Sequence, residues 1–283
     1  MPDAAPAPTV TPATKALHTW SLFRTLDRYV APGSMPLGGL PESTGPAPDL
    51  LALPAGLAAH GYGSAQLCHF YLSRRDPAYL GELRAAFADA GVVLECLLVD
   101  DGDLAHPADG DAQRDWVSGW LEAAELLGAT RARVVAGKQD PEEATLAASA
   151  RRLRELADRH PDLALVTENW HALLPDAASA LDLLARTEGR VGLLLDLGNW
   201  KGPDRHAQLA AVADRAETCQ AKVRTEPDGR LDLDEYRTCL QILADAGYAG
   251  PLAMVHDGPD PDEWGRLDDA HAVVRSVFGS AGA

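Results

Sequence analysis

Two acidic residues, Glu168 and Asp196, each end a short apolar run in the sequence, LALVTE and VGLLLD. A continuous apolar run of about 4–8 residues is typical of a buried strand. The spacing between the two acids is close to that of one strand–helix–strand unit, which takes roughly 30 residues. We therefore expect both carboxylates at the same end of adjacent parallel strands, where oxygen donors suit a divalent cation.

An acid that follows a strand can instead cap the next helix, and this interpretation stays open for either acid alone. Both acids, however, are followed by an Asn-Trp pair, Asn169 and Trp170 in one case and Asn199 and Trp200 in the other. The matched positions favour a functional site. The two tryptophans either pack in the core or form the wall of a sugar-binding site, and the sequence leaves both possibilities open.

The elements that must position these residues alternate between strands and helices. We predict strands over residues 16–24, 64–72, 92–100, 131–137, 163–168, 190–196, 217–224 and 251–256. We predict helices over residues 49–61, 77–91, 111–128, 141–160, 175–189 and 207–216, within 225–250, and over 268–279. Eight alternating strands and helices predict a (β/α)8 TIM barrel. An open doubly wound sheet is the alternative, but no GxGxxG or Walker motif follows any strand.

The ends of the chain and one long loop stand apart from this alternation. Residues 1–15 are rich in Pro and Ala and are predicted to be a disordered tail, which leaves residues 16–283 as one barrel domain. Residues 31–54 are rich in Pro and Gly and predict a long loop or a lid.

The composition narrows the class of partner. The 283 residues include 42 acids and 25 bases, a net charge of −17, which argues against a nucleic-acid surface. The four cysteines have no CxxC spacing, which points to a reducing compartment, and we expect a cytoplasmic location. The sequence shows neither a signal peptide nor a long apolar run, and we expect no membrane partner. A small-molecule substrate is the expected partner, and a homo-oligomer is possible.

Active sites of such barrels lie at the C-terminal ends of the strands. Polar and aromatic residues at the predicted strand ends are Trp20, Ser21, His69, Asp100, Asp101, Lys138, Gln139, Glu168, Asn169, Trp170, His171, Asp196, Asn199, Trp200, Gln220, Lys222, His256 and Asp257. Side chains alternate along a strand, so Gln220 and Lys222 share one face, which we expect to be the interior. His18 and His69 are also well explained as core histidines that hydrogen-bond to the backbone.

At these residues the sequence resembles the xylose isomerase-like TIM barrels, also called the sugar phosphate isomerase/epimerase family. The segments that carry the resemblance are VTENW, GLLLDLGNWKGP, CQAKVR followed by DGRLDLDEY, and GYAGPLAMVHDGP, and it extends roughly from Leu17 to Trp264. The resemblance implies a divalent metal, usually Mn, Mg, Co or Zn, bound by a Glu, an Asp, a His and a Glu on the last four strands. It also implies that the two Glu residues move protons on a sugar carbon.

Two of those four positions match this sequence, namely Glu168 and Asp196. The family's His falls on Gln220, which is a neutral oxygen donor, and its second Glu falls on Val255, which can neither bind a metal nor move a proton. We expect His256 or Asp257 to complete the metal shell if the end of the last strand curls inward.

Three hypotheses follow, and a fourth, the endonuclease branch of the same superfamily, is disfavoured by the acidic composition and by the lack of that branch's many metal-binding histidines. The first is a metal-dependent isomerase or epimerase acting on a sugar or small polyhydroxy carbonyl compound. The second is a metal-assisted lyase, dehydratase or hydrolase that needs one proton-transfer carboxylate. The third is a degenerate barrel that binds a small ligand or a protein partner without catalysis. For the first, the expected catalytic residues are Glu168, Lys222 and His171; the metal ligands are Glu168, Asp196, Gln220 and His256; the substrate contacts are Trp20, His69, Asp101, Lys138, Asn199 and Asp257.

Overall fold

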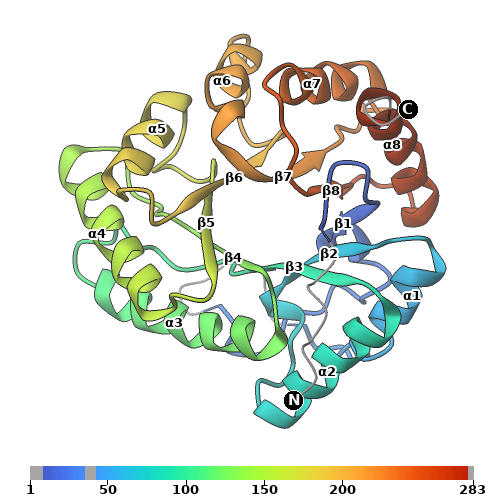
Figure 1. Cartoon of the computed structure of the whole chain (residues 1–283), viewed down its shortest axis with the longest axis horizontal. Coiled ribbons are helices and arrows are strands. Elements are labelled where there is room, and N and C mark those ends of the chain that lie inside the picture. The colour runs from blue at the N-terminus through green and yellow to red at the C-terminus, as the bar shows by residue number, and fades with distance from the viewer. Residues whose placement is uncertain (1–8, 36–42, 280–283) are drawn as a thin grey trace.

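The computed structural model describes residues 9–35 and 43–279, and these form a closed barrel of eight parallel strands in sequence order (Figure 1). The barrel closes where β1 pairs with β8 through Leu17 and Met254. The strands are β1 (Ala16–His18), β2 (Ser64–Cys68), β3 (Val93–Leu98), β4 (Arg131–Val134), β5 (Ala164–Glu168), β6 (Gly192–Asp196), β7 (Ala216–Lys222) and β8 (Leu252–Val255). This arrangement confirms the predicted (β/α)8 TIM barrel.

Helices form a ring around the strands (Figure 1). They are α1 (Leu53–Ala59), α2 (Pro77–Ala90), α3 (Gly110–Leu127), α4 (Glu143–Arg159), α5 (Ala177–Arg186), α6 (Arg205–Val212), α7 (Leu233–Asp245) and α8 (Glu263–Phe278). Local signals in the sequence set several of their ends. For α2, the Asp76 carboxylate accepts a hydrogen bond from the Tyr79 N–H, Pro77 begins the helix, and Gly91 ends it at φ +66°.

The first two strands are shorter than the sequence predicted. β1 stops at His18, where a 3-10 turn over Thr19–Leu22 begins, and β2 stops at Cys68, where a second such turn covers His69–Tyr71. The first turn is fixed because His18 Nδ1 accepts a hydrogen bond from the Trp20 N–H at 3.0 Å. Apolar runs therefore predicted burial correctly at these strand ends but not extended backbone.

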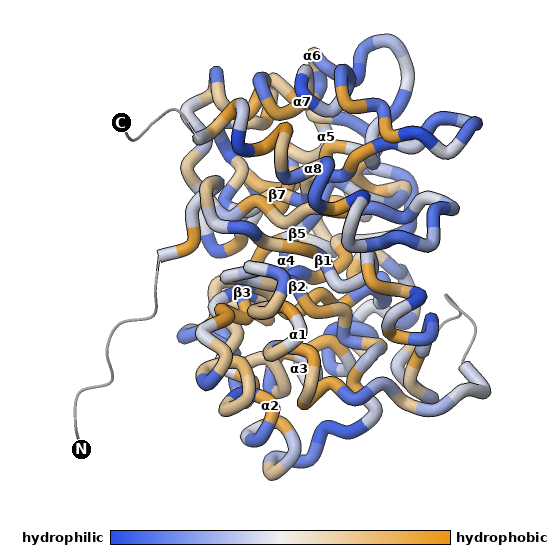
Figure 2. Tube along the Cα trace, turned by 90° about the vertical axis from the view of Figure 1, so that its right-hand side faces the viewer, coloured by the Kyte–Doolittle hydropathy of each residue, from blue (hydrophilic) through white to orange (hydrophobic). Residues whose placement is uncertain are grey.

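Apolar residues of the strands and of the inner helix faces form one continuous core, while much of the outer loops is hydrophilic (Figure 2). The barrel interior itself contains a buried polar network. Gln66 Nε2 donates to Glu95 Oε2 at 2.9 Å and to Thr218 Oγ1 at 3.2 Å, and Arg131 Nη1 donates to Glu95 Oε1 at 3.2 Å. These bonds link β2, β3, β4 and β7 across the barrel and pair both Glu95 oxygens where water is excluded, while Arg131 Nε is left without a partner.

Parts of the predicted tail and loop lie outside the described residues, namely 1–8 and 36–42. The described residues between 31 and 52 contain neither helix nor strand, and Met35 from this segment reaches the barrel mouth. Residues 9–15 lead into β1, and Lys15 Nζ lies 2.6 Å from Asp268 Oδ1 on α8. The division into tail and domain stays a prediction. No helix in the described part of the chain combines the length and apolarity that crossing a bilayer requires.

Candidate active site

A cavity of about 380 Å³ opens at the C-terminal ends of the strands, within the range of small-molecule sites. Every strand, or the turn that follows it, contributes to its wall. The lining residues are His18, Trp20, Met35, Cys68, Phe70, Asp100, Asp101, Arg133, Lys138, Glu168, Trp170, His171, Asp196, Asn199, Gln220, Lys222 and Val255. Charged and aromatic groups from all parts of the sequence thus face one small volume.

Nine of the twelve residues proposed from the sequence line this cavity: Trp20, Asp101, Lys138, Glu168, His171, Asp196, Asn199, Gln220 and Lys222. The other three do not. His69 is buried, and its ring nitrogens lie 3.1 Å from the carbonyl oxygens of Leu98 and Ser34. His69 is therefore the backbone-bound core histidine that the sequence allowed as an alternative. Asp257 lines a second hollow, which shares Trp20 with the cavity, and it contacts Lys222 of the cavity lining.

His256 also lies outside the cavity. The side chain that β8 turns toward the mouth is Val255, so alternation directs the next residue outward. The His256 N–H donates to Ser21 Oγ at 3.0 Å, while both ring nitrogens are buried without a hydrogen-bond partner. The end of β8 does not curl inward, and the geometry gives no support to His256 as a metal ligand.

Glu168 ends β5 and is only 5% exposed, with both carboxylate oxygens against neighbouring groups. Asn199 Nδ2 donates to Oε1 at 2.6 Å, and Arg133 Nε lies 3.0 Å from Oε2 as an ion pair without hydrogen-bond alignment. Burial raises the pKa of Glu168 to about 7; Arg133 opposes the rise and the Asp196 charge adds to it. A carboxyl group with this pKa is suited to taking up and releasing protons near neutral pH.

Arg133 was not among the residues proposed from the sequence, although it is central to the site. It is 1% exposed, pairs through Nη2 with Asp100, and donates through Nη1 to the Val99 carbonyl oxygen at 3.0 Å. Its guanidinium lies 5.2 Å from the centre of the Trp170 ring. A charged residue on a predicted strand is the signal that pointed to Lys222, and the same reasoning applied to β4 would have found Arg133.

Asp196 ends β6 beside Glu168, and the two asparagines of the repeated Asn-Trp pattern have different roles. Asn169 bridges the two strands, since its Oδ1 accepts from the Asp196 N–H at 2.7 Å and its Nδ2 donates to the Asp196 carbonyl oxygen at 3.0 Å. Asp196 Oδ1 accepts from the Gly198 N–H at 2.6 Å. Burial raises the pKa of Asp196 to about 6, although the Lys222 charge opposes the rise.

The two tryptophans of that pattern also differ. Trp170 lines the cavity, and its ring stacks on His171 with the ring centres 3.9 Å apart. Trp200 is buried, and its indole N–H donates to the Leu174 carbonyl oxygen at 2.9 Å. Each of the two interpretations that the sequence left open therefore holds for one tryptophan.

His171 follows β5 with a left-handed backbone at φ +61°, a conformation that costs energy for a residue with a Cβ. Its Nε2 is buried without a hydrogen-bond partner. Burial lowers the pKa of His171 to about 4, and the charges of Lys138 and Arg133 lower it further. The ring is therefore neutral at pH 7, with a nitrogen available to a ligand.

Lys222 and Gln220 both point from β7 into the cavity, as strand alternation predicted. Lys222 Nζ lies 2.5 Å from Asp257 Oδ2, and an added Cβ on Gly198 would lie 2.8 Å from the lysine Cδ, so glycine makes room for its stem. Burial alone would lower the pKa of Lys222, but Asp257 and Asp196 outweigh it and the pKa is raised. Gln220 Nε2 donates to Gln66 Oε1 at 3.1 Å.

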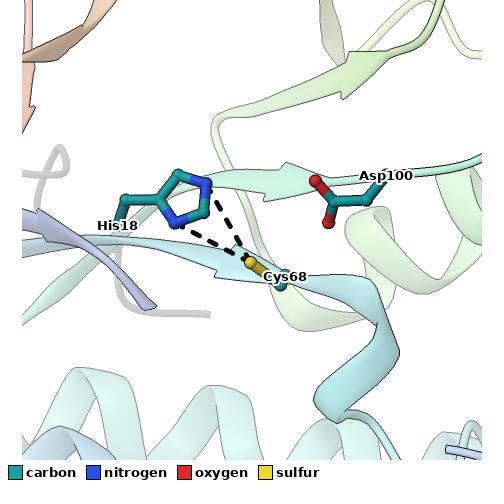
Figure 3. Close-up of side chains that lie close together, drawn as sticks. All are labelled: His18, Cys68 and Asp100. Atoms are coloured by element: carbon teal, nitrogen blue, oxygen red, sulfur yellow. Dashed lines mark hydrogen bonds between the residues drawn. The ribbon is translucent and has the colours of Figure 1, made fainter. Parts of the chain in front are cut away.

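Two clusters among the described residues bring three possible metal donors within 4.8 Å of one another. One consists of His18, Cys68 and Asp100, at the ends of β1, β2 and β3, where the His18 ring faces the Cys68 sulfur and the Asp100 carboxylate (Figure 3). The His18 Nδ1 lone pair already accepts the Trp20 N–H, which leaves the proton of the neutral ring on Nε2. This tautomer presents no free ring nitrogen to a metal.

The second cluster lies outside the barrel, between α6 and α7, and consists of His206, Glu235 and Cys239. Arg205 Nη2 contacts Glu235 and also donates to Cys239 Sγ at 3.6 Å. Its guanidinium already provides the positive charge in this cluster.

A family model described as xylose isomerase-like TIM barrel matches residues 55–275. Three similar solved structures share 15–17% identity with this chain. A xylose isomerase-like TIM barrel protein from Mycobacterium smegmatis, in complex with magnesium, has 17% identity and a TM-score of 0.65, with 93% of this chain and 97% of that chain covered. The probable 3-DHS dehydratase AsbF from Bacillus anthracis has 15% identity and a TM-score of 0.65, with 92% and 98% covered.

D-psicose 3-epimerase from Clostridium cellulolyticum, solved with D-tagatose, has 16% identity and a TM-score of 0.62, with 81% of this chain and 93% of that chain covered. At such identities the structural likeness establishes the fold alone. No curated protein matches this chain in sequence.

Proposed function

Because this chain belongs to the xylose isomerase-like TIM barrel family, we propose that it moves a proton next to the carbonyl group of a small polyhydroxy compound, as a sugar isomerase does. The observation that carries the proposal is Glu168, a buried carboxyl group with a pKa near neutrality that faces a cavity of substrate size. The substrate class is taken from neighbours that are named as acting on such compounds, among them the psicose epimerase.

In the proposed reaction, the Glu168 carboxylate takes the proton from the carbon beside the carbonyl group. The electron pair of the broken C–H bond forms the enediolate, whose negative charge lies on the former carbonyl oxygen. Lys222 holds that oxygen from β7. The proton of the hydroxyl group on the adjacent carbon moves to the former carbonyl oxygen, and Glu168 returns its proton to the former carbonyl carbon, so that the new carbonyl group stands on the carbon that first lost its proton. The raised pKa of Lys222 keeps its ammonium charged for this purpose.

The remaining lining residues hold the substrate. His171 offers a neutral ring nitrogen without a partner to a hydroxyl group, and Trp170 offers an aromatic face to the sugar carbons. Asn199 fixes the Glu168 carboxylate by donating to Oε1. Lys138 pairs with Asp101 at the rim of the cavity and provides further polar contacts.

The two acid–base carboxyl groups of the cavity, Glu168 and Asp196, end the neighbouring strands β5 and β6, and the described lining has no carboxylate on β8. This arrangement decides between related reactions. Inverting a carbon needs proton transfer on both of its faces, and Val255 occupies the wall where a second carboxylate is expected. A single base suffices to move a proton between adjacent carbons, which favours isomerisation over epimerisation. A single base also suffices for dehydration, and we keep a dehydratase as the second candidate for this reason.

A divalent metal, expected at Glu168, Asp196, Gln220 and His256, fits the residues present poorly. Glu168 has Arg133 and Asn199 against its two oxygens, Gln220 is neutral, and His256 lies outside the cavity. Two carboxylates beside a fixed guanidinium are a weak set even for Mg²⁺, which accepts few protein ligands. No step of the proposed reaction uses a metal.

The test is deuterium incorporation from D₂O into a panel of aldoses, ketoses and hydroxy carbonyl compounds, followed by NMR. Glu168→Gln is expected to lower the exchange rate by at least about 10²-fold, the usual worth of a general base. Glu95→Gln is the matched control, because Glu95 is an equally buried acid that does not line the cavity. Equal exchange in wild type and Glu168→Gln would refute the proposal, and a product lighter by one water would identify the dehydratase.

A further inference from the structure

Arg133 stands between two groups of acids at the barrel mouth. Its Nη2 pairs with Asp100, which follows β3, and its Nε lies 3.0 Å from Glu168 Oε2 at the end of β5. Its Nη1 is held by the Val99 carbonyl oxygen at 3.0 Å. The guanidinium is therefore fixed on three sides, and its charge is permanent at any pH at which the protein is folded.

Both places in the cavity with donors for a cation share this one arginine. Asp100 belongs to the cluster with His18 and Cys68, and Glu168 belongs to the group with Asp196 and Gln220. A divalent ion bound at either place would lie beside a buried positive charge in a region of low dielectric constant, where repulsion is strong. The arginine thus opposes metal binding at both places.

The other donors do not compensate for this repulsion. The Gln220 amide is neutral, and its Nε2 is engaged with Gln66. The His18 ring accepts the Trp20 N–H at 3.0 Å through Nδ1. The described lining of the cavity contains Val255 on β8, which supplies no donor atom.

We propose that Arg133 is the resident cation of this cavity: it provides the positive charge that a divalent metal would provide, and the cavity holds no such metal. The catalytic part of this proposal rests on the proposed function. In that reaction, the guanidinium faces the enediolate oxygen from β4 while Lys222 faces it from β7. The ligand of the cavity is accordingly a polyhydroxy carbonyl compound bound without a bridging metal.

The test measures metal binding and does not depend on activity. Purified wild-type protein is analysed for bound metals and titrated with Mn²⁺ by electron paramagnetic resonance and thermal shift. We expect no stoichiometric metal and a Kd weaker than about 1 mM, the weak end of the range for oxygen-donor sites. Arg133→Gln removes the resident charge, leaves its acids without a counter-ion, and should tighten Mn²⁺ binding by at least about tenfold.

Arg131→Gln is the matched control, because Arg131 lies two positions away on β4 and pairs with the buried Glu95 below the cavity. Mn²⁺ binding should be unchanged in this variant. If Arg133→Gln does not fold, the double variant Arg133→Gln/Asp100→Asn removes one of the two acids that have lost their counter-ion. Its Mn²⁺ affinity is then compared with that of the wild type. Stoichiometric metal in the wild type, or no gain in affinity without Arg133, would overturn the proposal.

The two proposals fail separately. If deuterium exchange is found for no compound while the metal measurements agree with expectation, only the isomerase proposal fails. If exchange depends on Glu168 and also on a bound metal, the isomerase proposal survives and the resident-cation proposal fails.

Discussion

Two arginines on β4 pair with buried glutamates at successive levels of the barrel interior, and the two pairs differ in how completely they are satisfied. Both Glu95 oxygens accept hydrogen bonds, one from Arg131 and one from Gln66. At the upper level, Glu168 Oε2 and Asp100 Oδ2 are buried without a hydrogen bond, while the arginine Nε is unpaired at both levels, in Arg131 as in Arg133.

The difference distinguishes a structural pair from a functional one. A carboxylate with both oxygens paired costs less to bury and holds strands together, whereas an unpaired carboxylate oxygen beside a cavity is available to a ligand. The lower level therefore links the strands of the barrel. The upper level has unpaired polar atoms that can hydrogen-bond to a substrate.

The largest effect on stability is expected at the lower level. Arg131→Gln leaves the Glu95 carboxylate inside the barrel without its charged partner. We expect a loss of about 3 kcal/mol in the free energy of unfolding, typical for breaking a buried pair. Denaturant-induced unfolding measures it. A loss below about 0.5 kcal/mol, the usual size of a surface substitution, would mean that the lower pair is not structural.

An intermediate effect is expected for Gln66→Met, which keeps the side-chain volume but removes the amide that joins the two levels. Glu95 and Thr218 lose a donor, and Gln220 Nε2 loses its acceptor. We expect a loss of about 2 kcal/mol in unfolding free energy, the cost of leaving buried polar groups unpaired. Gln241→Met, on the exposed face of α7, is the control and should change stability little.

The smallest expected effect on stability is a pH dependence that comes from the upper level. The pKa of His171 is lowered to about 4, from a usual 6.5, so the folded state favours the neutral ring. The contribution of the neutral ring to the free energy of unfolding is fully present above pH 6.5 and is lost as the pH falls toward 4. We expect a loss of about 1–2 kcal/mol over this window, allowing for partial solvent screening.

His171→Asn should remove that part of the acid-side loss, as measured by unfolding at a series of pH values between these limits. His106→Asn is a suitable control, because His106 is partly exposed and lies outside the described cavity lining. An unchanged acid-side slope in His171→Asn would show that His171 does not titrate in this window.

The sequence alone determined the barrel and most of its mouth. Alternating apolar runs and capped helices fix eight strand–helix units, and parallel strands bring their C-terminal ends together whatever the details of packing. Glu168, Asp196, Gln220 and Lys222 could therefore be placed at one end of the barrel before any coordinates were known. The shortened β1 and β2 could not, because burial of an apolar run does not specify extended backbone.

Only the tertiary structure decided which charges meet. Arg133 contacts Asp100 and Glu168, each more than thirty positions away in the sequence, and no local pattern encodes such a pairing. The same holds for the outward turn of His256 and for the separate roles of Trp170 and Trp200. Side-chain partners across a barrel depend on register and shear between strands, which chain order leaves undetermined.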